Sequence, residues 1–416
     1  MRPRLLCLML TGWLLSCVSP PPAVNSRDEG VVTVGRQGKS GGGDGSGSSA
    51  SGAPVAGASG GTQWGSFRPI PIVSGLVPTS TESTGPLSQV NRFFDFDFRG
   101  PSGMWTVKPA LNRGRAGLQA GVVDDVLIAV EGEHRPSMEA FGRTDRQAPS
   151  WVLNDSYDEK GATGSGDRLG YGLWLSAGGV FNNNELWTAG GFRGDFNPDG
   201  GSGRTELLRY QVSGFSQGRP DGGSYNLSRP RRAPAGGVLD HVFVVAGGVY
   251  EASAGALPRV DLIDLLKTGP DAVRTGPNLP TPVAGAASAV VDKRLYVLGG
   301  YDPRTPNQAL KQVQIYDLAA NNWTTGVDLP EGRHSAAATA NNGVIYLVGG
   351  VSEGGTPQKT FWSFNTQRKD AKWERLPDLP TARALLALVA HRGELWAIGG
   401  IGASRTALPI VEGYRL

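Results

Sequence analysis

The stretch Ile-Tyr-Leu-Val-Gly-Gly at 345–350, an apolar run closed by two glycines, decides the fold because the chain repeats it. Related runs stand at 242–248, 295–300 and 395–400, and their second glycines, at 248, 300, 350 and 400, are 52, 50 and 50 residues apart. A nearly constant period of this length indicates a tandem array. Each run fits a buried strand, since it is too short for a helix and its glycines allow the backbone to turn with positive φ.

A longer frame surrounds each run. An arginine stands seventeen residues before the second glycine in three of the four repeats, and a valine stands there in the other. Tryptophans stand ten residues before two of these arginines. The unit therefore predicts four strands: one after the arginine, one ending in Gly-Gly, one carrying Tyr316 or Phe364, and one carrying tryptophan. The residues that mark the frame are Arg231, Val283, Arg333, Arg383, Trp323 and Trp373.

The double glycine with its spaced tyrosine and tryptophan resembles kelch repeats, and that family folds each repeat into one blade of a β-propeller. The same spacing extends towards the N-terminus, where Arg115 stands seventeen residues before the end of the run 126–132, and 186–191 supplies another unit. In that unit we expect the preceding strand around Tyr171 to Leu175, displaced by extra residues from Gly178 to Asn184. Six units result, ending at 132, 191, 248, 300, 350 and 400.

Both ends of the repeat region contribute to the sixth blade. After Gly400 we expect one further strand, Ala407 to Tyr414, before the chain stops. The segment Met104–Pro109 lies ahead of the first unit and carries a tryptophan at the correct spacing, so it can supply the missing strand. We therefore expect an all-β fold over residues 101–416, a six-bladed kelch-type β-propeller closed by an N-terminal strand, which leaves no blade incomplete.

Residues 1–17 predict a lipoprotein signal peptide. Two arginines precede an apolar stretch from Leu5 to Leu15, which is too short to span a membrane because spanning needs about 20 apolar residues. The ending Leu-Leu-Ser-Cys resembles a bacterial lipoprotein box, in which Cys17 would become the lipidated first residue. An ordinary secretory signal with a chance cysteine is the alternative. The resemblance implies the outer membrane, because Val18 rather than an aspartate follows the cysteine.

The segment ahead of the repeats has two parts. Residues 18–63 are rich in glycine, serine and proline and predict a flexible linker, because they cannot bury enough apolar surface to fold. Apolar residues return in 64–100, which we expect to pack on the propeller. The net charge of +3 is spread along the chain, so nucleic acid is not implied. We expect a monomer that contacts the membrane through its lipid only.

The sequence also predicts a calcium loop. Asp195, Asn197, Asp199 and Glu206 match the pattern D-x-[DN]-x-[DN]-G-x5-E in full. Oxygen donors at every second position of a tight turn converge on one hard cation, and the final glutamate can bind with both oxygens. No helices are expected around this loop, which resembles the D-x-N-x-D-G loops between propeller strands. The alternative is a polar connection that only favours Asp, Asn and Gly.

The arginine series has two interpretations. Innermost strands surround a central channel in a propeller, so Arg115, Arg231, Arg333 and Arg383 are predicted to converge on the channel face and bind a ligand. Kelch adaptors, which these repeats resemble, place arginines near such positions in a pocket for acidic peptides. Alternatively, each arginine donates hydrogen bonds to backbone carbonyls of its own blade. The repetition of the residue favours this structural role.

Catalysis finds little support in the sequence. The four histidines match no metal-ligand spacing. Both cysteines lie within residues 1–17, which excludes the cysteine–tyrosine chemistry of copper radical oxidases built on kelch blades, and no sialidase box occurs. We therefore expect a binding module for a protein or glycan ligand in the cell envelope. The alternative, by resemblance, is an exported sugar mutarotase or epimerase of the sialic-acid mutarotase type, which Asp or Glu in the channel would favour; a structural envelope protein is the third interpretation.

Overall fold

The computed structural model describes residues 102–132, 137–142, 149–154, 173–193, 203–212, 216–218, 226–251, 255–305 and 308–416. All of them belong to one compact unit of the chain. The predicted signal peptide, the linker and the segment 64–100 lie outside the described residues. In the described part, no helix has the length and apolar character needed to cross a membrane.

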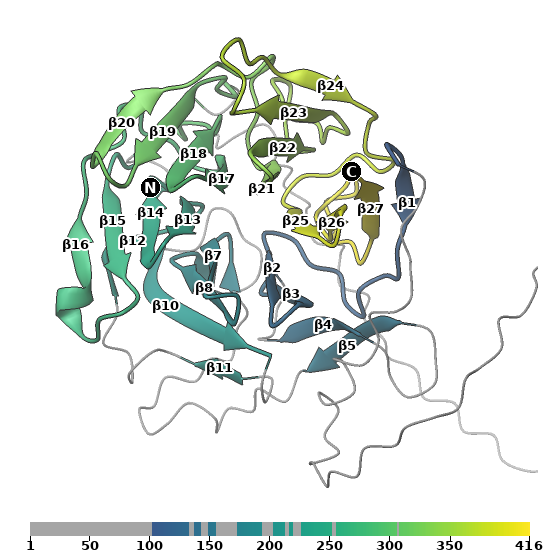
Figure 1. Ribbon diagram of the computed structural model, residues 1–416, viewed down its shortest axis with the longest axis horizontal. Helices are drawn as coiled ribbons and strands as arrows, with labels where there is room; N and C mark the ends of the chain where they lie inside the picture. Colours follow the sequence, from purple (N-terminus) through teal and green to yellow (C-terminus); the bar gives the residue numbers. More distant parts are fainter. Residues whose placement is uncertain are drawn as a thin grey trace, which may run out of the picture. The chain divides into compact units, whose positions relative to one another are not determined.

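The described residues form six antiparallel sheets that stand as blades around a centre (Figure 1). Blade 1 contains β2 (Gln119–Val123), β3 (Val126–Val130), β4 (Met138–Gly142) and β5 (Ser150–Asn154). Blade 2 contains β7 (Ala177–Phe181), β8 (Glu185–Ala189), β10 (Arg204–Gln211) and β11 (Ser216–Gly218), and β12 (Asn226–Arg231) also pairs with β10. Blade 3 contains β13 (Ala235–Leu239), β14 (Val242–Ala246), β15 (Val260–Asp264) and β16 (Val273–Thr275).

The other three blades follow the same plan. Blade 4 contains β17 (Ala287–Val291), β18 (Arg294–Leu298), β19 (Val313–Asp317) and β20 (Asn322–Thr325). Blade 5 contains β21 (Ala337–Asn341), β22 (Val344–Val348), β23 (Phe361–Asn365) and β24 (Glu374–Leu376). Blade 6 contains β25 (Ala387–His391), β26 (Glu394–Ile398), β27 (Val411–Arg415) and β1 (Trp105–Val107). A short pair, β6 (Leu173–Trp174) with β9 (Phe192–Arg193), and a 3-10 turn at Pro270–Ala272 complete the described elements.

Blade 6 confirms the predicted closure by the N-terminal strand. Strand β1 pairs with β27 in the register Trp105↔Tyr414, so the sheet order is β1-β27-β26-β25. Directly after β1, Lys108 places its ammonium 2.8 Å from both carboxylate oxygens of Glu394 on β26, and both residues are buried. The indole of Trp105 donates to the carbonyl of Pro377, which belongs to the connection from blade 5. Three kinds of contact therefore hold the closing strand.

The predicted inner strand of blade 2 is wrong. We expected it around Tyr171 to Leu175, but the strand is β7, and the residues expected as an insertion form β7 and its turn. Two glycines in β7 disguise it, because glycine is unfavourable in strands. The glycines are required by close packing: a Cβ on Gly179 would lie 2.7 Å from the backbone nitrogen of Val238 in blade 3, and one on Gly178 would lie 2.3 Å from Oε1 of Gln119 in blade 1.

The double glycine is a contact between neighbouring blades. In five blades the second glycine donates its N–H, at 2.7–2.9 Å, to the carbonyl of the residue that heads the next blade. A Cβ on the first glycine would lie 2.2–2.8 Å from the same carbonyl oxygen, so only glycine lets the blades approach this closely. The glycine–carbonyl pairs are Gly190 with Arg231, Gly247 with Val283, Gly299 with Arg333, Gly349 with Arg383, and Gly399 with Arg115.

A closed circle of backbone hydrogen bonds joins all six blades just before their inner strands begin. Each member donates its N–H to the carbonyl of the member in the preceding blade, over 2.7–2.8 Å, and the first member donates to the last. Every member has a positive φ between 51° and 62°. We call this circle the amide ring; its members are Gly117, Leu175, Ala233, Gly285, Ser335 and Leu385.

The hydrophobic core lies between neighbouring blades. Leu239 and Val244 of blade 3, for example, pack in one buried cluster with Leu295 and Val297 of blade 4. Tryptophans fix the connections between blades: Trp323 donates its indole N–H to Pro277 O at 2.9 Å, at a distance of 46 residues along the chain. Burial of apolar side chains on both faces of each sheet is the main stabilising contribution.

Replacing the first glycine of a double-glycine pair by alanine should lower the stability by more than the cost of placing alanine at positive φ. Gly299→Ala and Gly393→Ala both place a Cβ at positive φ, 65° and 79°, which costs about 1–2 kcal/mol. The Cβ at Gly393 has open space, whereas at Gly299 it lies 2.2 Å from Arg333 O. We therefore expect Gly299→Ala to lose a further 1–3 kcal/mol or so in urea denaturation. Equal losses for the two variants would contradict this account of the double glycine.

Candidate functional site

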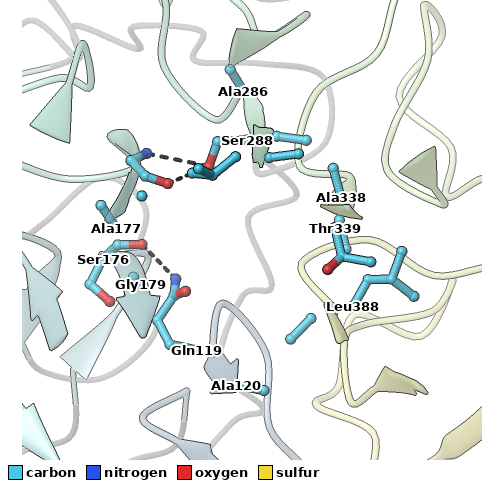
Figure 2. Close-up of a pocket in the computed structure, with 18 of the residues that line it drawn as sticks. Gln119, Ala120, Ser176, Ala177, Gly179, Ala286, Ser288, Ala338, Thr339 and Leu388 are labelled. Carbon is cyan, nitrogen blue, oxygen red and sulfur yellow. Dashed lines mark hydrogen bonds between the residues drawn. The ribbon is translucent and has the colours of Figure 1, made fainter. Parts of the chain in front are cut away.

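The centre of the propeller is a channel of about 360 Å³. Its lining begins, in each blade, at the residue directly after the amide-ring member and continues along the inner strands β2, β7, β13, β17, β21 and β25. Alanine and glycine predominate, and the other lining residues are Leu, Val, Pro, Ser, Thr and Gln (Figure 2). None of the described residues that line the channel is Asp, Glu, Lys, Arg or His.

Polar side chains in the channel wall connect neighbouring blades. Gln119 donates from Nε2 to the carbonyl of Ser176 at 2.7 Å, which joins blade 1 to blade 2 (Figure 2). Ser288 donates its hydroxyl to the carbonyl of Gly236 at 2.8 Å and accepts from the N–H of the same glycine at 3.3 Å, which joins blade 4 to blade 3. Thr339, on β21, carries the remaining hydroxyl of the lining besides that of Ser176.

A buried carboxylate lies behind the wall at the seam of blades 1 and 2. Glu131 occupies the first-glycine position of blade 1 with φ 63°. Its carboxylate accepts hydrogen bonds from the hydroxyls of Ser176, Thr188 at 2.7 Å and Tyr210 at 3.0 Å, all in blade 2. Burial raises the pKa of the Glu131 carboxyl, while the three hydroxyls and the charge of Arg115 oppose that rise. The site is fully enclosed, so Glu131 supports the wall rather than lining the channel.

The structure places the four predicted ligand-binding arginines inside their own blades. They are 0–2% exposed, and none lines the channel. Each donates to the backbone carbonyl of the first-glycine position of its own blade, at 2.7–3.3 Å. This geometry corresponds to the structural alternative. Ligand binding by Arg115, Arg231, Arg333 and Arg383 stays a prediction.

Three of these arginines form an ion pair with an acidic side chain. The acid occupies the same position in each of the three blades, the second residue of the third strand. Arg115 Nε lies 3.0 Å from Glu139, Arg231 Nη2 lies 2.8 Å from Asp261, and Arg383 Nη2 lies 2.7 Å from Glu412. Burial lowers the pKa of Arg231 and Arg383, and the partner carboxylates oppose this. Each guanidinium is hydrogen-bonded to its partner carboxylate, and this pairing offsets the cost of burying the two groups.

The two remaining regular blades show that arginine and acid change together. Where Val283 replaces the arginine, the acid position is Gln314, whose amide exchanges hydrogen bonds with the backbone of Thr281. In blade 5 the acid position holds Trp362, and Arg333 instead pairs with Glu331 of its own turn. Each buried arginine of the series therefore has a carboxylate partner. Blade 4, which lacks the arginine, lacks the acid as well.

A group of polar side chains from blades 3 to 5 lies next to Ser335 of the amide ring. The rings of Tyr301 and His334 have centroids 4.9 Å apart, and His334 Nδ1 is 3.0 Å from Ser335 Oγ. Burial, together with the charge of Arg333, lowers the pKa of His334 to about 4, so the imidazole is neutral at pH 7. Burial raises the pKa of Tyr301, and the nearby Arg232 opposes this.

The predicted metal and lipid sites fall largely outside the described residues. Asp195, Asn197, Asp199 and Cys17 are not among them, whereas Glu206 lies on β10 and pairs in register with Asn226 of β12. The described ranges contain no group of three or more His, Cys, Asp or Glu side chains placed to hold a metal ion. The calcium site stays a prediction.

Comparison with known proteins agrees with this architecture. The sequence model of the KLHDC2/KLHL20/DRC7 Kelch-repeats domain matches residues 192–407, which is more than half of the chain. The chain belongs to this kelch-repeat family. The match includes the double-glycine seams of blades 3 to 6, the part of the kelch propeller in which the sequence period is most regular.

Individual kelch relatives match over short stretches. Alpha-scruin of Limulus polyphemus is 36% identical over 63 residues, 15% of this chain and 7% of that protein. Kelch-like protein terF of Aspergillus terreus is 36% identical over 74 residues, 17% of this chain and 16% of that protein. The chain therefore spans less than a fifth of the length of these relatives. Among solved structures, "Structure of YjhT" aligns with a TM-score of 0.57 at 15% identity over 73% of this chain and 95% of that one, which supports the fold alone.

The arginine–acid pairs give a test by substitution. Arg383→Ala leaves Glu412 buried without its counter-charge and should cost about 3–5 kcal/mol in the free energy of unfolding. The double variant Arg383→Val with Glu412→Gln copies the Val283 and Gln314 combination of blade 4 and should lose much less. Chemical denaturation monitored by tryptophan fluorescence measures both. A double variant as unstable as the single one would show that the pair acts through something other than charge balance.

Proposed function

We propose that this kelch propeller is a binding module of the cell envelope, with a protein or glycan ligand held at the central channel. The observation that supports this most directly is the channel wall, which offers hydrogen-bonding groups and small side chains without an ionisable group. Its volume of about 360 Å³ lies within the roughly 300–1,000 Å³ range of small-ligand sites.

The same wall favours binding over the mutarotase alternative. Opening and closing a sugar ring requires proton transfer by a positioned acid and base. Asp or Glu in the channel would have supported that chemistry, but the described lining has neither. The carboxylate behind the wall, Glu131, is occupied by three hydroxyl donors and enclosed, so a ligand in the channel does not meet it.

Two further proposals concern the N-terminus and the calcium loop. We place the protein as a monomer on the outer membrane through a lipid on Cys17, and mass spectrometry of the mature N-terminus tests this, because any other first residue rejects it. We assign calcium to Asp195, Asn197, Asp199 and Glu206. A melting temperature that responds neither to chelator nor to added calcium would reject that assignment.

Ligand capture from envelope extracts tests the binding function. Full-length, tagged protein should retain an envelope component, and Ala338→Leu should lose it by narrowing the channel. Blade 6 carries Leu388 at the equivalent position, so the substitution suits the strand. Val107→Thr, on the outer edge where the side chain is 83% exposed, should retain the component. Nothing retained by the unaltered protein would reject the binding function, and retention by Ala338→Leu would place the site away from the channel.

A further inference from the structure

The inner strands turn one backbone edge towards the channel. Each of β2, β7, β13, β17, β21 and β25 is the last strand of its sheet and has a hydrogen-bonded neighbour on one side only. Its other edge faces the centre, where the six edges meet around the channel (Figure 1). The N–H and C=O groups on that edge have no partner within the sheet and need one from a side chain, water or ligand.

Two contacts across blade seams identify which backbone groups point inward. Both the N–H and the C=O of Gly236 bond Ser288 across the seam, so neither is used by β14. The carbonyl of Ser176 accepts from Gln119 in the same way. Ser176 follows its amide-ring member by one residue and Gly236 by three, and strand residues alternate with period two. The first, third and fifth residues after each amide-ring member therefore present backbone groups to the channel.

Small side chains leave these groups accessible. The third position is occupied by Ala120, Gly178, Gly236, Ser288, Ala338 and Leu388. Only blade 6 carries a large residue there, Leu388, whose side chain is buried with Leu386 in the core between blades 5 and 6. Thr339 adds a hydroxyl on β21. The channel wall thus presents mainly neutral donors and acceptors.

This wall selects the chemistry of its occupant. A charged ligand would leave water for a site whose lining supplies no counter-charge, which is unfavourable. An apolar ligand would cover the inward backbone groups without bonding them. A neutral ligand with many hydroxyls can both donate hydrogen bonds to these backbone and hydroxyl groups and accept hydrogen bonds from them. Resting on the proposed binding function, we infer that the channel binds an uncharged saccharide, the end of a neutral glycan.

Saturation-transfer NMR with the full-length protein tests this inference with matched sugars. Glucose, galactose and N-acetylglucosamine serve as neutral probes, and glucuronate and galacturonate are acidic probes of nearly the same size. We expect saturation transfer to at least one neutral probe and none to its acidic counterpart. Ala338→Leu should abolish the signal, and Thr339→Val should raise the Kd about three- to tenfold through loss of one hydrogen bond. Val107→Thr is the control, and thermal melting verifies that each variant is folded.

The outcomes separate the inference from the function on which it rests. Equal binding of acidic and neutral probes, a signal unchanged in folded Ala338→Leu, or no signal from any neutral probe would overturn the saccharide assignment. If no neutral probe gives a signal and envelope capture still succeeds, the binding function stands and its ligand is not a neutral sugar. If capture fails as well, both are rejected.

Discussion

The amide ring is the contact on which the geometry of the propeller depends. Its six hydrogen bonds run in one direction around the axis, so each blade receives one bond and gives one. All six members adopt a left-handed backbone conformation, although four of them are leucine, alanine or serine residues in which it is strained. The double-glycine contacts have the same kind of bond as this circle: an N–H of one blade donates to a carbonyl of the neighbouring blade. The channel is the space that this circle and the inner strands leave.

The fold was largely predictable from the sequence, because its period is visible in residues with special conformational roles. The glycines at 248, 300, 350 and 400 are such residues, and the tryptophan before Arg115 revealed the closing strand. Blade 2 was misread where glycine serves packing rather than turning: Gly178 and Gly179 lie inside β7, pressed against Gln119 and Val238. A sequence pattern in which glycine ends a strand cannot recognise a strand whose glycines allow close packing against the neighbouring blades.

The candidate site was less predictable. The arginines drew attention because they repeat, yet their partners Glu139, Asp261 and Glu412 lie 24 to 30 residues later and repeat with them, and this joint pattern was the available signal for a structural role. The channel gives no such signal. Its wall consists of alanine, glycine and backbone, and residues such as Ala338 carry no chemistry that sequence reasoning can identify. Only the meeting of six sheet edges turns these residues into a surface that can bind.

The closing strand also has a mechanical consequence. Any pull applied to the chain ahead of Ser102 enters the ring at Ser102 and Gly103, which contact Arg415, and then loads β1, which forms three residue pairs with β27. Force along an antiparallel strand loads its hydrogen bonds together in shear, and here the buried Lys108–Glu394 ion pair and the Trp105 indole share that load. In a propeller without such an N-terminal closing strand, tension from this end would act directly on the first blade. Closure by β1 instead makes the joint between the two ends of the ring the part that bears tension.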